Sequence, residues 1–220
     1  MKLLKIVANN FKLCEENFTI SFVPTGTKTL DDKEFELHEL AEELYTFKTL
    51  GIIGKNASGK TTAVELLSVV YDIFSNFRIN NSKNIFKFID KTVNLDITFF
   101  HENTIYRYMV DLEKNINSVD NTMIFFKNEK LYKRAYKKYH SKNIFEYDKF
   151  EEVNFDVKLP NDTSMIYSLL NDISLRGIYC PSDDNMYRFY ANSFNIYNLL
   201  NNDLGIVTSI LKMFDEHLDN

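Results

Sequence analysis

The chain has 220 residues, of which 45% are hydrophobic and 26% charged, and its net charge at pH 7 is −5. This length allows one domain with a sizeable core, and the composition is that of an ordinary globular protein. The negative charge gives no general affinity for nucleic acid or anionic membranes, and no apolar run approaches the roughly 18 residues of a membrane span. The two cysteines lack metal-ligand spacing, so we expect reduced thiols in a cytoplasmic protein without membrane contact.

The first part of the chain is predicted to place two strands ahead of a glycine-bounded loop. Apolar and polar residues alternate over residues 3–7 and 18–22, with turn residues between them. The acidic stretch 31–43 is predicted to be a helix or a polar loop. Residues 44–53 are predicted to be the strand that leads into the loop. Residues 61–77 are predicted to be the following helix, with one buried stripe: Val64, Leu67, Val70, Tyr71 and Phe74.

The loop itself, residues 54–61, matches G-x-x-x-x-G-K-[ST], which is typical of a phosphate-binding loop between a strand and a helix. Glycines let the backbone approach phosphate oxygens, and the N–H groups of the loop and helix start form an anion nest. Lys60 would act on the β- and γ-phosphates as the catalytic cation, and the Thr61 hydroxyl would ligate Mg2+. The pattern therefore predicts ATP and Mg2+ as cofactors, held by Gly54, Lys55, Asn56, Ala57, Ser58, Gly59, Lys60, Thr61 and Thr62. A purely structural glycine turn is the disfavoured alternative.

The middle of the chain is predicted to be antiparallel. Residues 92–100 and 105–112 alternate on either side of a turn, which is typical of a β-hairpin, and residues 123–126 are predicted to be a third strand. Residues 159–163 are predicted to start a helix capped by Asn161 or Asp162. Its predicted buried stripe is Met165, Ile166, Leu169, Leu170 and Ile173. A loop at 180–185 and an aromatic-rich helix at 187–200 are predicted to follow.

One segment, residues 127–142, is strongly basic. It contains Lys127, Lys130, Lys133, Arg134, Lys137, Lys138 and Lys142, interleaved with Tyr132, Tyr136 and Tyr139. Such cations neutralise phosphates, and aromatic rings stack on bases, so nucleic acid is one possible partner. A solvated strand or loop whose lysines discourage edge pairing is the favoured alternative, because the whole chain is acidic.

Several stretches resemble ATPases of the ATP-binding-cassette (ABC) and SMC type, in which two strands precede the phosphate loop. LKIVANNFKLCEENFTISF (residues 4–22) resembles their opening strand, Asn-Phe-Arg/Lys turn and second strand. GKNASGKTT resembles the loop of bacterial AAA-type ATPases related to overcoming-lysogenisation-defect and abortive-infection proteins. LPNDTSMIYSLLND (residues 159–172) resembles the start of their inserted helical arm, and VTSILKMFDEHLDN (residues 207–220) the helix before their signature loop.

This resemblance implies an α/β P-loop NTPase fold, the N-terminal lobe of an ABC-like ATPase with a mixed sheet. The implied parts are a nucleotide-binding core at 1–90, an antiparallel β-subdomain at 91–158 and a helical arm at 159–220. It also implies that Asn10, Phe11 and Lys12 face the nucleoside, that Thr62 contacts the α-phosphate, and that Asn56 shapes the loop or its γ side.

The residues that such an ATPase needs for hydrolysis are not recognisable. The apolar run before Asp215 and Glu216 is interrupted by Lys212 and has helical spacing, and the Asp183–Asp184 pair follows no strand. There is no Ser-Gly signature beyond the loop and no glutamine. We therefore expect the N-terminal portion of a longer ATPase of bacterial defence or DNA maintenance. It would bind ATP, form a nucleotide-dependent homodimer when complete and hydrolyse almost nothing alone. The alternatives are a nucleotide-dependent binding module without catalysis and, less favoured, a stand-alone P-loop kinase or GTPase.

Overall fold

The computed structural model describes residues 1–170 apart from 56–57, 77, 83–84, 117–121 and 155–158. The chain divides into two compact units, Met1–Tyr179 and Cys180–Asn220, and all the described residues belong to the first. The elements predicted beyond residue 180, including both acidic pairs, therefore lie outside the described residues.

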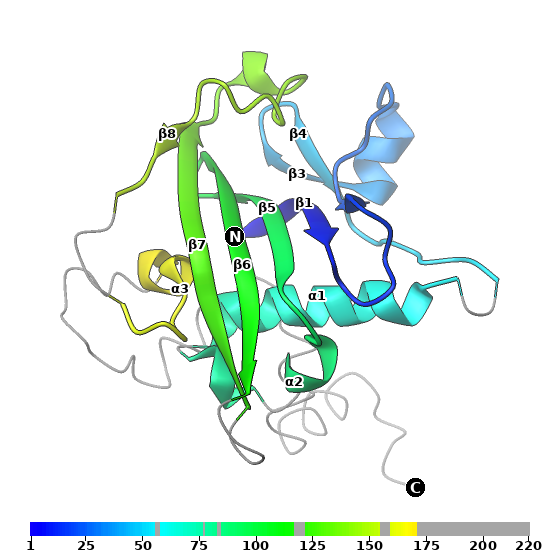
Figure 1. The fold of residues 1–220 in the computed structure, drawn as a ribbon. Coiled ribbons are helices and arrows are strands. Elements are labelled where there is room, and N and C mark those ends of the chain that lie inside the picture. Colours follow the sequence, from blue (N-terminus) through cyan, green and yellow to red (C-terminus); the bar gives the residue numbers. More distant parts are fainter. Residues whose placement is uncertain (56–57, 77, 83–84, 117–121, 155–158, 171–220) are drawn as a thin grey trace, which may run out of the picture. The chain divides into compact units, whose positions relative to one another are not determined.

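A six-stranded sheet forms the centre of the first unit, and all of its neighbouring strands are antiparallel (Figure 1). Its strands are, in spatial order, β2 (Phe18–Ser21), β1 (Lys2–Asn9), β5 (Val93–His101), β6 (Thr104–Ile116), β7 (Thr122–Ala135) and β8 (Glu151–Glu152). Because β1 pairs with β5, the sheet joins the predicted core to the predicted β-subdomain.

Alternation of apolar and polar residues predicted four of these strands, and the β5–β6 hairpin is confirmed. Its turn is formed by Glu102 and Asn103, with φ of +46° and +59°, a conformation that suits a tight two-residue hairpin turn. The third predicted strand is also confirmed, as β7, but it continues through half of the basic segment to Ala135.

One face of the sheet is packed against helix α1 (Lys60–Ser75). The Phe74 ring meets the Phe99 ring of β5 edge-on, with centroids 5.2 Å apart. The predicted helix is thus confirmed, but its buried stripe is rotated from the predicted one. Val64 is 45% exposed, whereas the buried apolar positions are Ala63, Leu66, Val69, Val70, Ile73 and Phe74.

The other face of the sheet carries a second apolar cluster under a small hairpin of β3 (Leu37–Ala41) and β4 (Leu44–Phe47). The buried members of this cluster are Leu4, Leu44, Phe100, Ile105, Tyr136 and Ile144. The Tyr136 hydroxyl donates to the carbonyl oxygen of Glu42 in the hairpin turn at 2.7 Å. The hairpin is therefore attached to the sheet by both apolar packing and a hydrogen bond.

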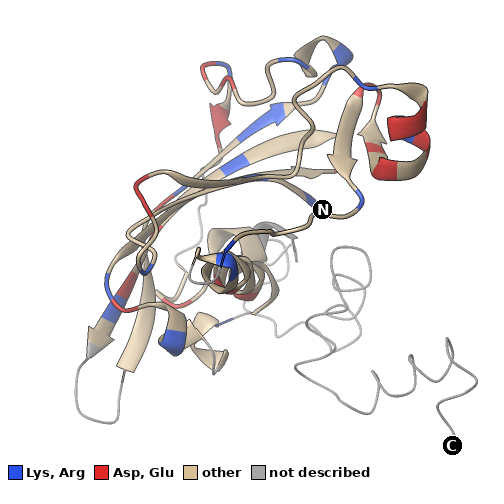
Figure 2. Ribbon diagram, turned by 90° about the vertical axis from the view of Figure 1, so that its right-hand side faces the viewer, with Lys and Arg blue, Asp and Glu red and all other residues tan. Residues whose placement is uncertain are grey.

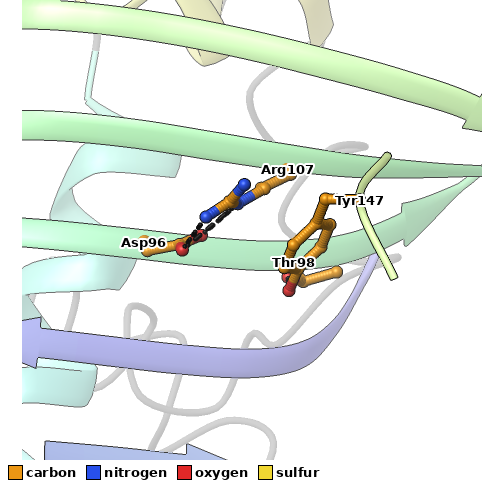
Figure 3. Close-up of polar contacts among 4 residues, drawn as sticks. All are labelled: Asp96, Thr98, Arg107 and Tyr147. Carbon is orange, nitrogen blue, oxygen red and sulfur yellow. Dashed lines mark hydrogen bonds and ion pairs between the residues drawn. The ribbon is translucent and has the colours of Figure 1, made fainter. Parts of the chain in front are cut away.

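Beside that cluster, the segment after β7 is attached to the sheet by polar contacts (Figure 3). The Arg107 guanidinium donates to both carboxylate oxygens of Asp96, with Nη2 2.7 Å from Oδ2. Its other contact is the Tyr147 ring, whose centroid is 3.9 Å from Cζ. The Tyr147 hydroxyl lies 2.8 Å from Oγ1 of the fully buried Thr98. A bidentate ion pair and a stacked ring thus hold residue 147 over β5 and β6.

The prediction of a helix or polar loop at 31–43 is wrong in its second half. A short π-helix, η1 (Asp32–Glu36), is followed directly by strand β3. The register pairs Leu37 with Phe47 and Ala41 with Leu44, so these two apolar residues lie beside apolar cross-strand neighbours and not on one face of a helix.

The predicted N-cap of α3 (Met165–Leu170) is also wrong. Ser164 Oγ accepts the N–H of Ile166 at 3.0 Å, and Glu129 Oε1 from β7 accepts the N–H of Met165 at 2.9 Å. The carbonyls of Asn161 and Asp162 instead accept N–H groups from other parts of the chain. The remaining short elements are η2 (Ile79–Asn81), α2 (Ile85–Phe88) and η3 (Lys138–His140).

Candidate functional site

The glycine-bounded loop leads directly into α1, which begins at Lys60. Gly59 has φ of +86°, in the left-handed region that L side chains avoid, and its carbonyl accepts the N–H of Ala63 at 2.9 Å. The backbone therefore changes direction at Gly59, and the helix begins at the next residue. The first N–H groups of the helix are left directed at the space in front of it.

Gly54 closes the other end of the loop. A Cβ on Gly54 would collide with the Ser58 hydroxyl oxygen and lie 3.2 Å from the Ser58 Cβ, so a side chain at residue 54 would have to displace that of Ser58. The Ser58 N–H also donates to the Lys55 carbonyl at 3.2 Å. Both glycines of the pattern thus have a geometric role in curling the loop, although Asn56 and Ala57 lie outside the described residues.

The Lys60 side chain folds back across this loop. Its Nζ donates to the carbonyl oxygen of Gly54 at 2.8 Å and to that of Lys55 at 2.6 Å. These are neutral partners, so the full positive charge stays at the start of α1. There it adds to the partial positive charge of the helix N-terminus.

A cavity of about 560 Å³ lies in front of the helix start. Its walls come from the α1 start and from the turn between β1 and β2; they are Leu13, Cys14, Glu15, Phe18, Ser58, Gly59, Lys60, Thr61 and Thr62. This volume lies within the range of small-molecule sites. Burial raises the pKa of the Cys14 thiol, so that side chain enters the wall as a neutral group.

The residues proposed for the nucleoside side do not line this cavity. Asn10 donates to the Asn94 side chain at 3.1 Å, and Phe11 is fully buried. Lys12 Nζ lies 2.5 Å from Glu65 Oε2 of α1 and 5.2 Å from the centroid of the Phe88 ring. These contacts attach the turn to β5, α1 and α2.

Sequence reasoning missed four residues that line the cavity: Leu13, Cys14 and Glu15 of the turn, and Phe18, the first residue of β2. The break in alternation at residues 9–10 locates the turn. The direction in which the side chains of the turn point depends on positive φ values at Asn10 (+59°) and Lys12 (+50°). No pattern in the sequence indicates those values.

The strand predicted to enter the loop is not formed. Strand β4 ends at Phe47, and residues 49–54 have no regular structure. Ile53 is 95% exposed and Leu50 41% exposed. A buried strand of this kind is covered on both faces and paired with parallel neighbours. Within the part of the chain that the structure describes, all strand pairs are antiparallel, so the prediction of a strand over 44–53 is wrong after residue 47.

The basic segment has many internal partners. Lys127 pairs with Glu113 at 2.7 Å, and Lys138 pairs with Glu42 at 2.5 Å. Arg134 donates to two backbone carbonyls, while Tyr136 is buried against the hairpin. Figure 2 shows that acidic and basic residues both occur on the long strands. These contacts favour the structural interpretation of the segment over a stacking surface for bases.

Comparison with known families supports the interpretation of the loop. A family model described as "AAA domain, putative AbiEii toxin, Type IV TA system" matches residues 50–211, more than half of the chain, and its match includes the whole loop. AAA domains are nucleotide-binding modules of the ATPase type, with an α/β NTPase fold. No curated protein is significantly similar in sequence to the chain. Among the helices that the structure describes, none is long and apolar enough to cross a bilayer.

Proposed function

The chain belongs to this family of AAA domains, and from that premise we propose that residues 54–62 bind ATP with Mg2+. The observation that carries the proposal is the position of the Lys60 ammonium, held by two carbonyls at the start of α1 beside a cavity of about 560 Å³. A phosphate in that cavity would exchange a neutral carbonyl partner of Lys60 for a charged one. The ammonium donor is charged with either partner, so the gain is the added charge–charge attraction between Lys60 and the phosphate.

The other residues of the loop take the roles that their positions allow. Thr61 and Thr62, in the first turn of α1, both reach the cavity wall. The Thr61 hydroxyl would ligate Mg2+, and Thr62 would contact the α-phosphate. The turn residues Leu13 and Phe18 offer an apolar wall for the nucleoside. Bound Mg2+ would neutralise charge on the β- and γ-phosphates; the chain itself orients the phosphates and directs N–H groups at them.

The biological setting of this binding is also a proposal. The family description, together with the resemblance to abortive-infection ATPases, supports a role in bacterial defence or DNA maintenance. In that setting the chain would be the N-terminal lobe of an ABC-like ATPase in the cytoplasm. It would have the ranges 1–90, 91–158 and 159–220 as core, β-subdomain and arm, and it would dimerise around ATP. A nucleic-acid contact through residues 127–142 would have to use the lysines of that segment that have no internal ion pair.

The test is calorimetric titration of the purified chain with ATP, with and without Mg2+. Changing Lys60→Ala is expected to weaken ATP binding by about 10- to 100-fold, since a hydrogen bond to a charged group contributes about 1.5–3 kcal/mol. Lys91→Ala is the matched control, because Lys91 is exposed and outside the cavity. Equal ATP affinity in the Lys60 variant and the control would overturn the proposal. Phosphate release measured in the same samples separates an ATPase from a binding module without catalysis.

A further inference from the structure

A second cavity, of about 620 Å³, lies beside the turn of the β3–β4 hairpin and shares no wall residue with the first. Its walls come from the segment after β2, from η1, from the hairpin turn and from the segment after η3. They are Val23, Pro24, Thr25, Gly26, Thr27, Lys28, Lys33, Glu43, Ser141, Lys142, Ile144 and Phe145. Three of these residues are lysines and only one is acidic, in a chain whose net charge is −5. The cavity therefore concentrates positive charge.

Two of the lysines are held in place by an aromatic ring. The Nζ atoms of Lys28 and Lys33 lie 5.5 and 5.2 Å from the centroid of the same Tyr45 ring, which is buried in the hairpin. A ring face attracts an ammonium without neutralising it. Two like charges are thus held against one ring, an arrangement that an anion between them would stabilise.

The lysines of this cavity differ from neighbouring lysines in their partners. Among the ion pairs of the described residues, none involves Lys28, Lys33 or Lys142, whereas nearby Lys138 pairs with Glu42. The acidic residues of η1, which appear red in Figure 2, do not line the cavity. The Glu39 carboxylate accepts the Tyr45 hydroxyl at 3.1 Å, so it lies near the ring that contacts Lys28 and Lys33 and offsets part of their positive charge.

We propose that this cavity binds a small phosphorylated molecule at a site separate from residues 54–62. Lysine ammonium groups are common phosphate partners, and the hydroxyls of Thr25, Thr27 and Ser141 add neutral donors to the same wall. The volume fits a small molecule, since such sites measure about 300–1,000 Å³. An extended nucleic-acid strand fits less well, because it would need a continuous row of cations and the adjoining Lys138 is already paired.

The experiment uses inorganic pyrophosphate as the probe, without Mg2+, and the full chain carrying Lys60→Ala so that the loop site is weakened. Binding is measured by calorimetry, and its location by amide NMR shifts. Saturable binding is expected, with shifts at residues 23–28 and 141–145. Lys28→Ala combined with Lys142→Ala should weaken it at least tenfold. Lys91→Ala combined with Lys130→Ala removes the same charge outside the cavity and should change it less than twofold.

A second variant separates loss of pyrophosphate binding from unfolding of the β3–β4 hairpin. Lys142→Glu changes an exposed side chain with no ion pair among the described residues, so its melting temperature should match that of the parent, while pyrophosphate binding falls at least tenfold. Absence of saturable binding, or equal weakening by the control pair, would overturn the proposal. So would binding of a single-stranded oligonucleotide, but not pyrophosphate, with the same lysine dependence. Because the ATP affinity of the chain with Lys60 intact is expected to be unchanged by Lys142→Glu, the two proposed sites can fail independently.

Discussion

Glu129 offers a sharp test of how the start of α3 is held on the sheet. Its Oε1 accepts the Met165 N–H at 2.9 Å and also the hydroxyl of Tyr108, a residue that is fully buried. Changing Glu129→Ala would leave both donors without this acceptor, at about 1–3 kcal/mol for each buried unsatisfied group. The expected loss of about 2–6 kcal/mol is a large part of the 5–15 kcal/mol typical of a domain.

Glu129→Gln is the matched control, because one amide oxygen can accept both donors while the charge is removed. Burial raises the pKa of Glu129 above its ordinary value of 4.5. Between 4.5 and the raised pKa the folded state binds more protons than the unfolded state, so the free energy of unfolding falls as pH rises through that interval. The contribution is most favourable below pH 4.5 and is lost above the raised pKa. The Gln variant has no such slope, so its stability relative to wild type should improve as pH rises.

The assay is urea unfolding followed by circular dichroism at several pH values from 4 to 8, with the unfolding free energy compared among the three proteins. Two results would refute the reasoning: an Ala variant within 0.5 kcal/mol of wild type, as expected of an ordinary surface change, or a Gln variant as unstable as the Ala variant. The second would mean that the ionised carboxylate, and not its acceptor geometry, holds the start of α3.

Two further predictions concern the loop and the sheet. Gly59→Ala should lower the unfolding free energy by about 1 kcal/mol, because Gly59 has φ of +86°. It should also weaken ATP binding in the calorimetric titration, whereas Gly26→Ala, at a glycine without positive φ and with open space around the added Cβ, should change neither. Arg107→Lys keeps the charge but loses the fork on Asp96 and the stack on Tyr147, so we expect about 1–2 kcal/mol of destabilisation by thermal unfolding. A Lys variant as stable as wild type would show that only the charge of Arg107 is needed.

The sequence predicted the local elements better than their surroundings. Alternation and turn residues were enough for β1, β2 and the β5–β6 hairpin, because those signals lie within a few neighbouring residues. The buried face of α1 was rotated from the predicted one, since the face is chosen by distant partners such as Phe99. The cap of α3 was missed for the same reason, because one of its acceptors, Glu129, comes from β7.

In the candidate site, too, the sequence predicted the local backbone but not the contacts with distant residues. The pattern from Gly54 to Thr61 predicted a tight loop that leads into a helix, and the positive φ of Gly59 and the close approach at Gly54 are the backbone features that such glycines serve. The opposite wall of the cavity could not be predicted, because Leu13 and Phe18 reach it only through the fold of the β1–β2 turn. The apolar run before the loop forms no strand after residue 47, because apolar residues alone do not make a strand without a pairing partner.

The two proposed anion sites share one physical feature: neutral groups position their lysines. Lys60 is positioned by carbonyl oxygens, and Lys28 and Lys33 are positioned by a ring. Lys127 and Lys138, by contrast, are positioned by carboxylates. A carboxylate partner must be given up or shared before an anion binds, whereas a carbonyl or a ring fixes the side chain and leaves its charge uncompensated. Cations held by neutral groups in a concave wall are therefore the preorganised ones. Together with the concave walls, this difference is the reason for placing the ligands at these two cavities and not at Lys127 or Lys138.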